Sequence, residues 1–202
     1  MAPFQRAEYL DRVEKTKVRM EKAGIEVLLV TSPANMFYLT GYETQGLWYF
    51  AGLIVPAAGE PFMTTRHAED TVVDSDTWVA VSRPFHDNQE PMGVLADALA
   101  EFGLAGKRIG YERASYFFRA HEQDGLFSRC PNADFVDCSW IVEEGRVVKS
   151  AAEIAMIARA AKATEAGTAA GVAAVRTGVT ENEVAAEVYR GMLTAGGHYC
   201  SM

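Results

Sequence analysis

Four histidines are the side chains in this sequence best suited to hold a metal ion or to transfer a proton. His67, His86, His121 and His198 never recur at the H-x-x-x-H or H-E-x-x-H spacing that places two imidazoles on one face of a helix. The acidic residues between 134 and 144 do not follow the D-x-D-x-D-G pattern of a calcium loop. The spacing of these groups therefore predicts no local metal site.

Three consecutive aromatic residues are the second group that could contact a ligand. Trp48, Tyr49 and Phe50 stand in a segment, 47–55, whose aromatic and β-branched residues predict a strand. Side chains alternate between the two faces of a strand, so these three rings cannot all point into one core. At least one ring then needs a role outside the core, and filling the core is the alternative for the others.

One arginine and one histidine are further candidates. Arg66 follows a predicted hairpin and could bind a substrate carboxylate, because a guanidinium matches that group with two parallel hydrogen bonds. An ion pair with Glu69 or Asp70 is the alternative. His198 could reach a substrate, and an ordinary surface histidine is the alternative.

Composition and charge exclude several classes of protein. The 202 residues carry a formal net charge of -8, which offers no basic face to nucleic acid or to an anionic membrane. No apolar run reaches the roughly 18 residues of a transmembrane helix, and the first residues do not resemble a signal peptide, so we expect a cytoplasmic protein. Cys130, Cys138 and Cys200 lack C-x-x-C spacing, and we expect small buried thiols.

Helices and strands alternate up to about residue 145, with one hairpin between them. This order predicts an α/β domain with a mixed sheet and helices packed on it. The apolar run 27–30 is typical of a strand that is buried on both faces. We expect helices over 8–22, 33–39, 66–73, 91–102 and 115–127, strands over 27–30, 47–55, 61–65, 78–81, 108–111 and 135–137, and a last turn or two through 142.

A second unit is predicted to follow, so that the domains are 1–145 and 146–202. Ser150 with Glu153, and Thr180 with Glu183, form capping boxes that satisfy free N–H groups at the start of a helix. Two helices without a sheet predict that this second domain is incomplete. The helix after Ser150 has small residues that allow a close neighbour, and its apolar face around Ile154 is expected to make the isolated chain associate.

Three segments resemble one known family. Residues 33–42 read P-A-N-M-F-Y-L-T-G-Y and resemble the N-x-x-Y-L-T-G segment of the creatinase/prolidase amino-terminal domain. Residues 149–154 resemble the K-S-x-x-E-I start of the attached pita-bread domain, and residues 176–183 resemble its G-x-T-E-x-E turn. The three matches stand in the family's order and cover nearly the whole chain.

The resemblance implies a fold and a class of reaction. The fold would be a ribonuclease H-like mixed β-sheet with flanking helices, followed by the first two helices of an α+β pita-bread domain. The family implied contains Xaa-Pro dipeptidases, aminopeptidase P, creatinase and ectoine hydrolase, which hydrolyse C–N bonds of short peptides or small amide or amidine-like molecules. Its peptidases hold two divalent metal ions, such as Mn, Co or Zn, with two aspartates, a histidine and two glutamates.

In that family the metal ligands lie beyond the two helices, so the resemblance assigns no catalytic and no metal-binding residue to this chain. It implies a homodimer in which the amino-terminal domain of one subunit leans over the active site of the other. Trp48, Tyr49, Arg66 and His198 would then contact a short peptide or small amide substrate bound to the partner subunit. The chain alone is expected to be inactive.

Two other functions remain open at this stage. The chain could be a non-catalytic, peptidase-like module that binds proteins. It could also be a small independent α/β enzyme that uses its own acidic residues.

Overall fold

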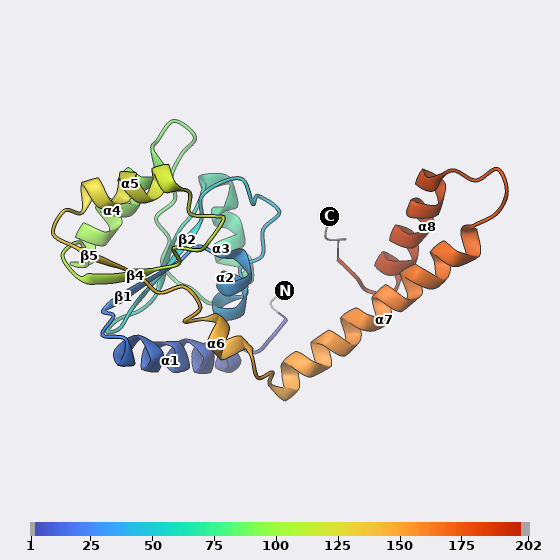
Figure 1. Ribbon diagram of the computed structural model, residues 1–202, viewed down its shortest axis with the longest axis horizontal. Helices are drawn as coiled ribbons and strands as arrows, with labels where there is room; N and C mark the ends of the chain where they lie inside the picture. The colour runs from blue at the N-terminus through green and yellow to red at the C-terminus, as the bar shows by residue number, and fades with distance from the viewer. Residues whose placement is uncertain (1–2, 199–202) are drawn as a thin grey trace. The chain divides into compact units, whose positions relative to one another are not determined.

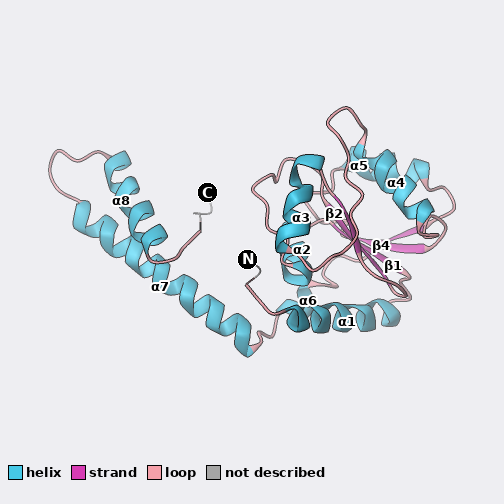
Figure 2. Ribbon diagram, turned by 180° about the vertical axis from the view of Figure 1, so that it is seen from behind, coloured by secondary structure: helices cyan, strands magenta, loops and turns pink. Residues whose placement is uncertain are grey.

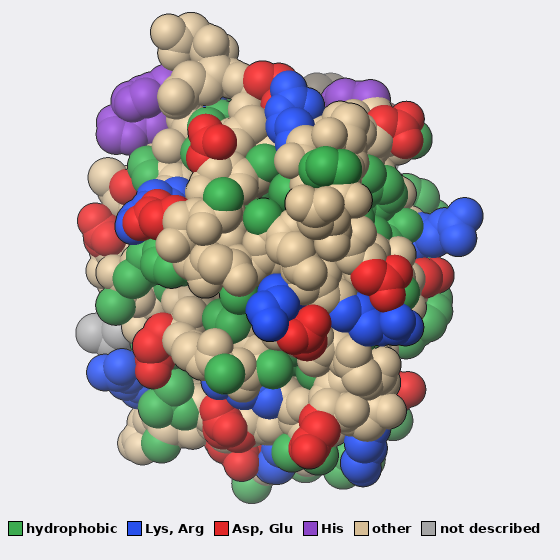
Figure 3. Space-filling model, turned by 90° about the vertical axis from the view of Figure 1, so that its left-hand side faces the viewer, with side chains coloured by type: hydrophobic (Ala, Val, Ile, Leu, Met, Phe, Trp, Pro, Cys, Tyr) green, Lys and Arg blue, Asp and Glu red, His purple; other side chains and the backbone are tan. Residues whose placement is uncertain are grey.

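The computed structural model describes residues 3–198, and the chain divides into two compact units, Met1–Val147 and Val148–Met202. The first unit contains every strand of the described residues, and the second consists of two long helices with their connections. Within residues 3–198, no helix combines the length and the apolar character needed to cross a bilayer. Lys and Arg side chains are interspersed with Asp and Glu over the face drawn in Figure 3.

A five-stranded mixed sheet forms the centre of the first unit (Figure 1). Its order is β3-β2-β1-β4-β5. β1 pairs antiparallel with β2 and β2 antiparallel with β3, whereas β1, β4 and β5 run parallel to one another. The strands are β1 (Val27–Val30), β2 (Gly52–Pro56), β3 (Phe62–Thr64), β4 (Arg108–Tyr111) and β5 (Asp134–Asp137).

Helices cover both faces of this sheet (Figure 2). α4 and α5 pack on one face, and α1, α2 and α3 pack on the other. The helices of this unit are α1 (Arg6–Lys22), α2 (Pro33–Thr40), α3 (Asp70–Asp76), α4 (Pro91–Glu101), α5 (Ala120–Arg129) and α6 (Glu143–Arg146), with a 3-10 turn, η1 (His67–Glu69), before α3.

β1 shows why the sheet needs two apolar faces. All four of its residues are buried. Val27 and Leu29 point into the core beneath α4, and Leu28 and Val30 into the core beneath α1 and α2. Successive side chains point to opposite sides of a strand, so a central strand with helices on both faces must be apolar throughout. The mixed sheet with flanking helices confirms the predicted fold class.

The loop before β2 differs from the prediction. The strand expected over 47–55 begins only at Gly52, and residues 47–49 form a turn closed by a hydrogen bond from the Tyr49 N–H to the Gly46 carbonyl. The argument from strand alternation was therefore wrong for Trp48, Tyr49 and Phe50. Phe50 nevertheless enters the core at 3% exposure, while its two neighbours stay outside.

The strand predicted over 78–81 is also wrong. That segment forms no regular strand. The Val81 carbonyl accepts the Met63 N–H, and the isolated parallel bridges Met63↔Ser82 and Arg66↔Phe85 join the following residues to β3 and the residues after it. The helix predicted from 115 starts at Ala120, because Arg119 is extended and donates its backbone N–H to the Glu122 carboxylate. Sequence reasoning missed this start because arginine is not a usual N-cap residue.

Other boundaries shifted by a few residues. The helix expected over 66–73 is divided into η1 and α3. The turn expected through 142 is present at residues 139–142 and leads into α6, which begins at Glu143. Cys130 and Cys138 are buried free thiols, as expected, and burial raises the pKa of both. The Cys138 sulfur lies so close to Gly110 of β4 that a Cβ at that glycine would overlap it. Cys200 lies outside the described residues.

The second unit is a helical hairpin of α7 (Ala151–Ala174) and α8 (Glu181–Thr194). Both capping boxes are present. The Glu153 N–H donates to Ser150 Oγ at 3.2 Å while the Ser150 N–H donates to Glu153 Oε2 at 2.7 Å. Thr180 and Glu183 form the same reciprocal pair of hydrogen bonds. The two boxes confirm the predicted helix starts; that this unit belongs to a catalytic domain stays a prediction.

Glycines bring α7 and α8 into close contact. A Cβ added at Gly191 would lie 2.9 Å from the carbonyl oxygen of Ala166 and 2.9 Å from the Cβ of Ala170. Gly167 and Gly171 of α7 are buried at the same interface. The small residues predicted to admit a close neighbour therefore admit α8.

This contact predicts that one substitution will destabilise the second unit. Gly191→Ala should destabilise the hairpin by about 1–3 kcal/mol, because the added methyl meets backbone and Cβ atoms that cannot move aside cheaply. Gly93→Ala in α4 is the matched control. The added Cβ would lie 3.6 Å from its nearest neighbour, which is ordinary contact. This variant should therefore be more stable than the wild type by about 0.5–1 kcal/mol, because alanine reduces the backbone freedom of the unfolded chain. Hydrogen exchange of α7 and α8 amides measures the first effect and of α4 amides the second. An equal increase in the free energy of unfolding for both variants would contradict the packing argument.

Candidate functional site

Arg66 is the basic centre of the predicted substrate contact. It follows β3, and its Nε and one terminal nitrogen donate to the two carboxylate oxygens of Asp87, each at 2.6 Å. Its guanidinium carbon lies 4.1 Å from the centre of the Tyr49 ring. The predicted alternative partners, Glu69 and Asp70, were therefore wrong. A substrate carboxylate that used the same two donors would have to displace Asp87, whose pKa the hydrogen bond from Arg66 lowers.

Trp48 and Tyr49 are exposed on a loop with a defined conformation. Their exposed fractions are 71% and 49%. The Trp48 carbonyl accepts a hydrogen bond from the Arg119 side chain at 3.0 Å, and Thr44 donates its hydroxyl to Glu69. With Phe50 buried, the loop is fixed on both sides of the two rings. Large rings held in water in this way are typical of surfaces that contact another molecule.

Two histidines lie beside Arg66, which sequence spacing did not predict. The rings of His67 and His86 are 4.4 Å apart between centroids. The bridge Arg66↔Phe85 brings them together, because each histidine follows one of its members. Eighteen residues of chain between them hide this proximity from a search for sequence motifs. Among residues 3–198, no three or more His, Cys, Asp or Glu side chains gather as metal ligands, so these residues do not fit a metal centre.

The four predicted substrate-contact residues fall into both units. Tyr49 and Arg66 are in contact, and Trp48 precedes Tyr49 on the loop 42–50. His198 belongs to the second unit, where it is exposed and follows α8. Contact of any of these four with a substrate stays a prediction.

Asn35, in the N-x-x-Y-L-T-G segment, occupies the centre of a buried polar network. Its amide nitrogen donates to Glu112 Oε1 at 2.5 Å and to Glu143 Oε1 at 2.7 Å. Its amide oxygen accepts from Arg146 at 2.6 Å. Both amide hydrogens and the oxygen are thus used, and one side chain joins α2, the residue after β4 and α6.

Glu112 is the other fixed point of this network. It is 3% exposed, and its Oε2 accepts the backbone N–H groups of Thr31 and Ser32, each at 2.7 Å. These donors stand at the start of α2, where helices have free N–H groups and favour negative charge. Burial raises the pKa of Glu112, while the hydrogen bonds from Asn35, Ser32 and Thr31 act against that rise.

The rest of the segment is also structural. Tyr38 donates its hydroxyl to the Gly145 carbonyl at 3.0 Å, which ties α2 to α6. Gly41 ends α2 with a φ of 88°, and a Cβ there would lie 2.9 Å from the Tyr9 hydroxyl. The segment therefore positions the loop 42–50 that follows it.

Comparison with known proteins gives the family. A model described as the creatinase/prolidase N-terminal domain matches residues 12–148. The chain belongs to this family. The creatinase/prolidase resemblance and the mixed-sheet fold are thus both confirmed.

Relatives of this creatinase/prolidase N-terminal domain are hydrolases and peptidases. An uncharacterised hydrolase/peptidase of Sinorhizobium fredii is 29% identical over 97% of this chain and 52% of its own. The ectoine hydrolase of Halomonas elongata is 27% identical over 93% and 49%. A solved prolidase from Thermococcus sibiricus shares the fold, with a TM-score of 0.75 and 20% identity over 94% of this chain and 50% of that one. The chain spans about half the length of the curated relatives it matches.

The network predicts that Asn35 is irreplaceable. Asn35→Ala should lower the free energy of unfolding by about 3 kcal/mol, because two carboxylates and one guanidinium lose a buried partner. Asn35→Asp should cost at least as much, since it keeps the shape but adds a third carboxylate. Urea unfolding followed by tryptophan fluorescence measures both. Asn88→Ala, an exposed loop position, is the control and should change stability by less than about 0.5 kcal/mol. A loss at Asn35 no larger than at Asn88 would show that the network does not hold the fold.

Proposed function

We propose that this chain is the amino-terminal, dimerising and pocket-lining part of a hydrolase that cleaves C–N bonds. The substrates would be Xaa-Pro peptides or small amide or amidine-like molecules. The match to the creatinase/prolidase N-terminal domain over residues 12–148 supports the class of enzyme, as do relatives named hydrolase and peptidase. The two capped helices of α7 and α8 would open a pita-bread catalytic domain. The protein would work as a cytoplasmic homodimer.

One observation carries the proposed pocket-lining role. The loop 42–50 is fixed by hydrogen bonds and by Phe50, yet holds Trp48 and Tyr49 in solvent beside Arg66. A ring of proline or of a small cyclic amide would pack on such aromatic faces. Arg66 would meet a negatively charged substrate group after exchange with Asp87. Contact of His198, in the second unit, with substrate is a separate part of the proposal.

No catalytic step is assigned to residues of this chain. Prolidases and related peptidases generally bind divalent metal ions, but the described residues contain no cluster that fits one. When bound, paired divalent ions would lower the pKa of a water molecule and polarise the scissile carbonyl. The residues proposed here would contribute binding and orientation only.

The first test is the isolated chain. With manganese and an Xaa-Pro dipeptide, the 202-residue chain should release no product. Hydrolysis would overturn the proposal that catalytic residues lie elsewhere.

The coding sequence after Met202 provides a second test: two aspartates, a histidine and two glutamates in family order would support the hydrolase. A stop codon there would favour a non-catalytic binding module.

The exposed rings give a prediction for any longer form that is active. Trp48→Ala should lower kcat/KM about tenfold, mostly through KM, because a ring that packs on bound substrate contributes roughly 1.4 kcal/mol. Thermal stability should be unchanged, since this ring is outside the core. Trp48→Phe keeps an aromatic face and should retain most of the activity. Unaltered kinetics for Trp48→Ala would remove Trp48 from the substrate pocket.

A further inference from the structure

A crevice opens in the first unit where the chain leaves β1 and β4. These neighbouring strands are parallel, so both end at the same edge of the sheet. The two connections that follow lead to opposite faces of the sheet. α2, which follows β1, contributes Met36 to one core, and α5, which comes after β4, contributes Leu126 to the other. In open α/β sheets, ligands bind outside the carboxyl ends of the strands at such a reversal.

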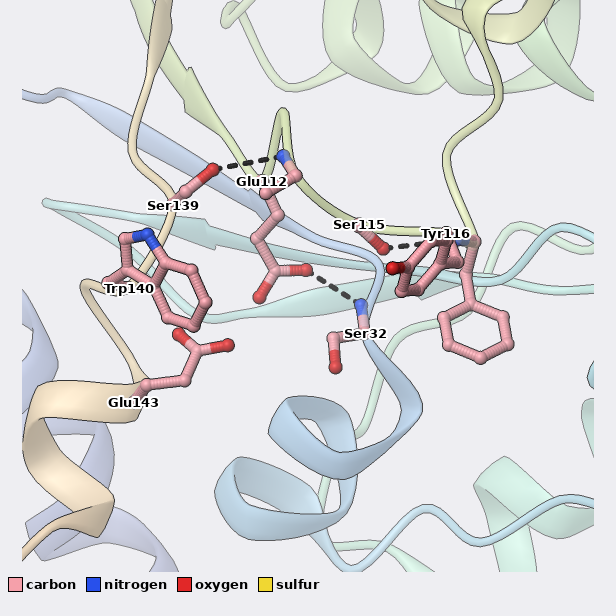
Figure 4. Close-up of a pocket in the computed structure, with 9 residues that line it drawn as sticks. Ser32, Glu112, Ser115, Tyr116, Ser139, Trp140 and Glu143 are labelled. Carbon is pink, nitrogen blue, oxygen red and sulfur yellow. Dashed lines mark hydrogen bonds between the residues drawn. The ribbon is translucent and has the colours of Figure 1, made fainter.

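A cavity of about 120 Å³ occupies this crevice (Figure 4). Its residues come from the ends of the three parallel strands: Ser32 follows β1, Glu112 follows β4 and Ser139 follows β5. The volume admits a head group of a few heavy atoms and is too small for a peptide, whose sites usually exceed about 300 Å³.

Aromatic rings form the walls of the cavity. Tyr116 and Trp140 are exposed by 92% and 65%, and Phe117 lies beside Tyr116. In Figure 4, Trp140 and Tyr116 stand on opposite sides of Glu112. Rings this exposed contribute little to the core, so stability does not explain their presence here.

Trp140 is held in an unusual backbone conformation. Its φ of 80° is the only positive φ at a non-glycine residue among residues 3–198. Hydrogen bonds on both sides fix it: Ser139 binds Asp137 through its N–H and hydroxyl, and the Trp140 carbonyl accepts from the Glu144 N–H. Strain of this kind at a bulky residue concentrates at ligand sites.

The charge of the cavity is negative and incompletely balanced. Its lining includes Glu112 and Glu143 and no Lys, Arg or His. Glu112 accepts hydrogen bonds at both oxygens, but only Oε1 of Glu143 has a partner, Asn35. Oε2 of Glu143 is buried without a hydrogen-bond partner. Buried carboxylate oxygens are normally paired, so the negative charge of Glu143 stays incompletely compensated beside the cavity.

We propose that this cavity binds an organic cation, a guanidinium or alkylammonium head group, with Glu143 as its counter-charge and Trp140 and Tyr116 as its walls. Aromatic faces attract such cations, and a carboxylate beneath them supplies the opposite charge. The head group belongs either to a free small molecule or to an Arg or Lys side chain of a second copy of this chain. None of the lining residues of this site belongs to the loop 42–50, and the site does not depend on the proposed hydrolase function.

Titration of the chain with methylguanidinium chloride tests the proposal, with methylurea as the neutral match and sodium chloride as the ionic-strength control. The indole NMR signal of Trp140, assigned with Trp140→Phe, should shift saturably at millimolar methylguanidinium and not with methylurea. Glu143→Gln should weaken binding about tenfold or more, because it removes the charge and keeps an oxygen for Asn35. Glu144→Gln, one residue further and outside the cavity, should bind as the wild type does.

Two further measurements complete the test. Tyr116→Ala, at a position too exposed to endanger folding, should weaken binding severalfold even if Glu143→Gln proves unstable. Sedimentation with and without methylguanidinium separates the sources: dissociation of an oligomer indicates a side chain of another copy, and an unchanged species indicates a free small molecule. A shift that methylurea reproduces, or equal binding by Glu143→Gln and Glu144→Gln in folded protein, would overturn the proposal.

Discussion

The first unit depends on one buried amide. Asn35 gives both of its hydrogens to carboxylates and takes a hydrogen bond from a guanidinium, so groups of opposite charge are held around a neutral centre. Glu112 is buried and Glu143 and Arg146 are half-buried, and charged groups in such positions are costly without hydrogen-bond partners. Because the partners come from residues 112, 143 and 146, the amide also connects the end of β4 to the last helix of the unit. The N-x-x-Y-L-T-G segment is thus explained by structure rather than by chemistry.

That network controls both surfaces that could meet a ligand. On one side, α2 and its closing Gly41 set the start of the loop that carries Trp48 and Tyr49. On the other, Glu112 and Glu143 face the crevice at the end of the parallel strands. The same buried network thus supports two surface regions with exposed aromatic rings, the loop with Trp48 and Tyr49 and the crevice with Tyr116 and Trp140.

The sequence predicted those elements whose causes are local. The capping boxes at Ser150 and Thr180 and the apolar run of β1 each carry their reason within a few residues, and all three are present. The errors lie where distant neighbours decide. Asp87 pairs with Arg66 because a parallel bridge aligns two segments. The segment 78–81 forms no strand, although its Val81 carbonyl accepts the N–H of Met63 in β3. The cavity at the strand ends has no motif at all, since three separate strand ends build it.

The contact between Gly110 and Cys138 has a practical consequence. The sulfur lies against the backbone of β4, where a glycine leaves just enough room for it. Cys138 follows β5, the edge strand beside β4, so an alkylating reagent gains access to its buried thiol when that edge of the sheet opens. The rate of alkylation at Cys138 therefore reports the rate of transient opening of the sheet, and it can be measured on the native protein.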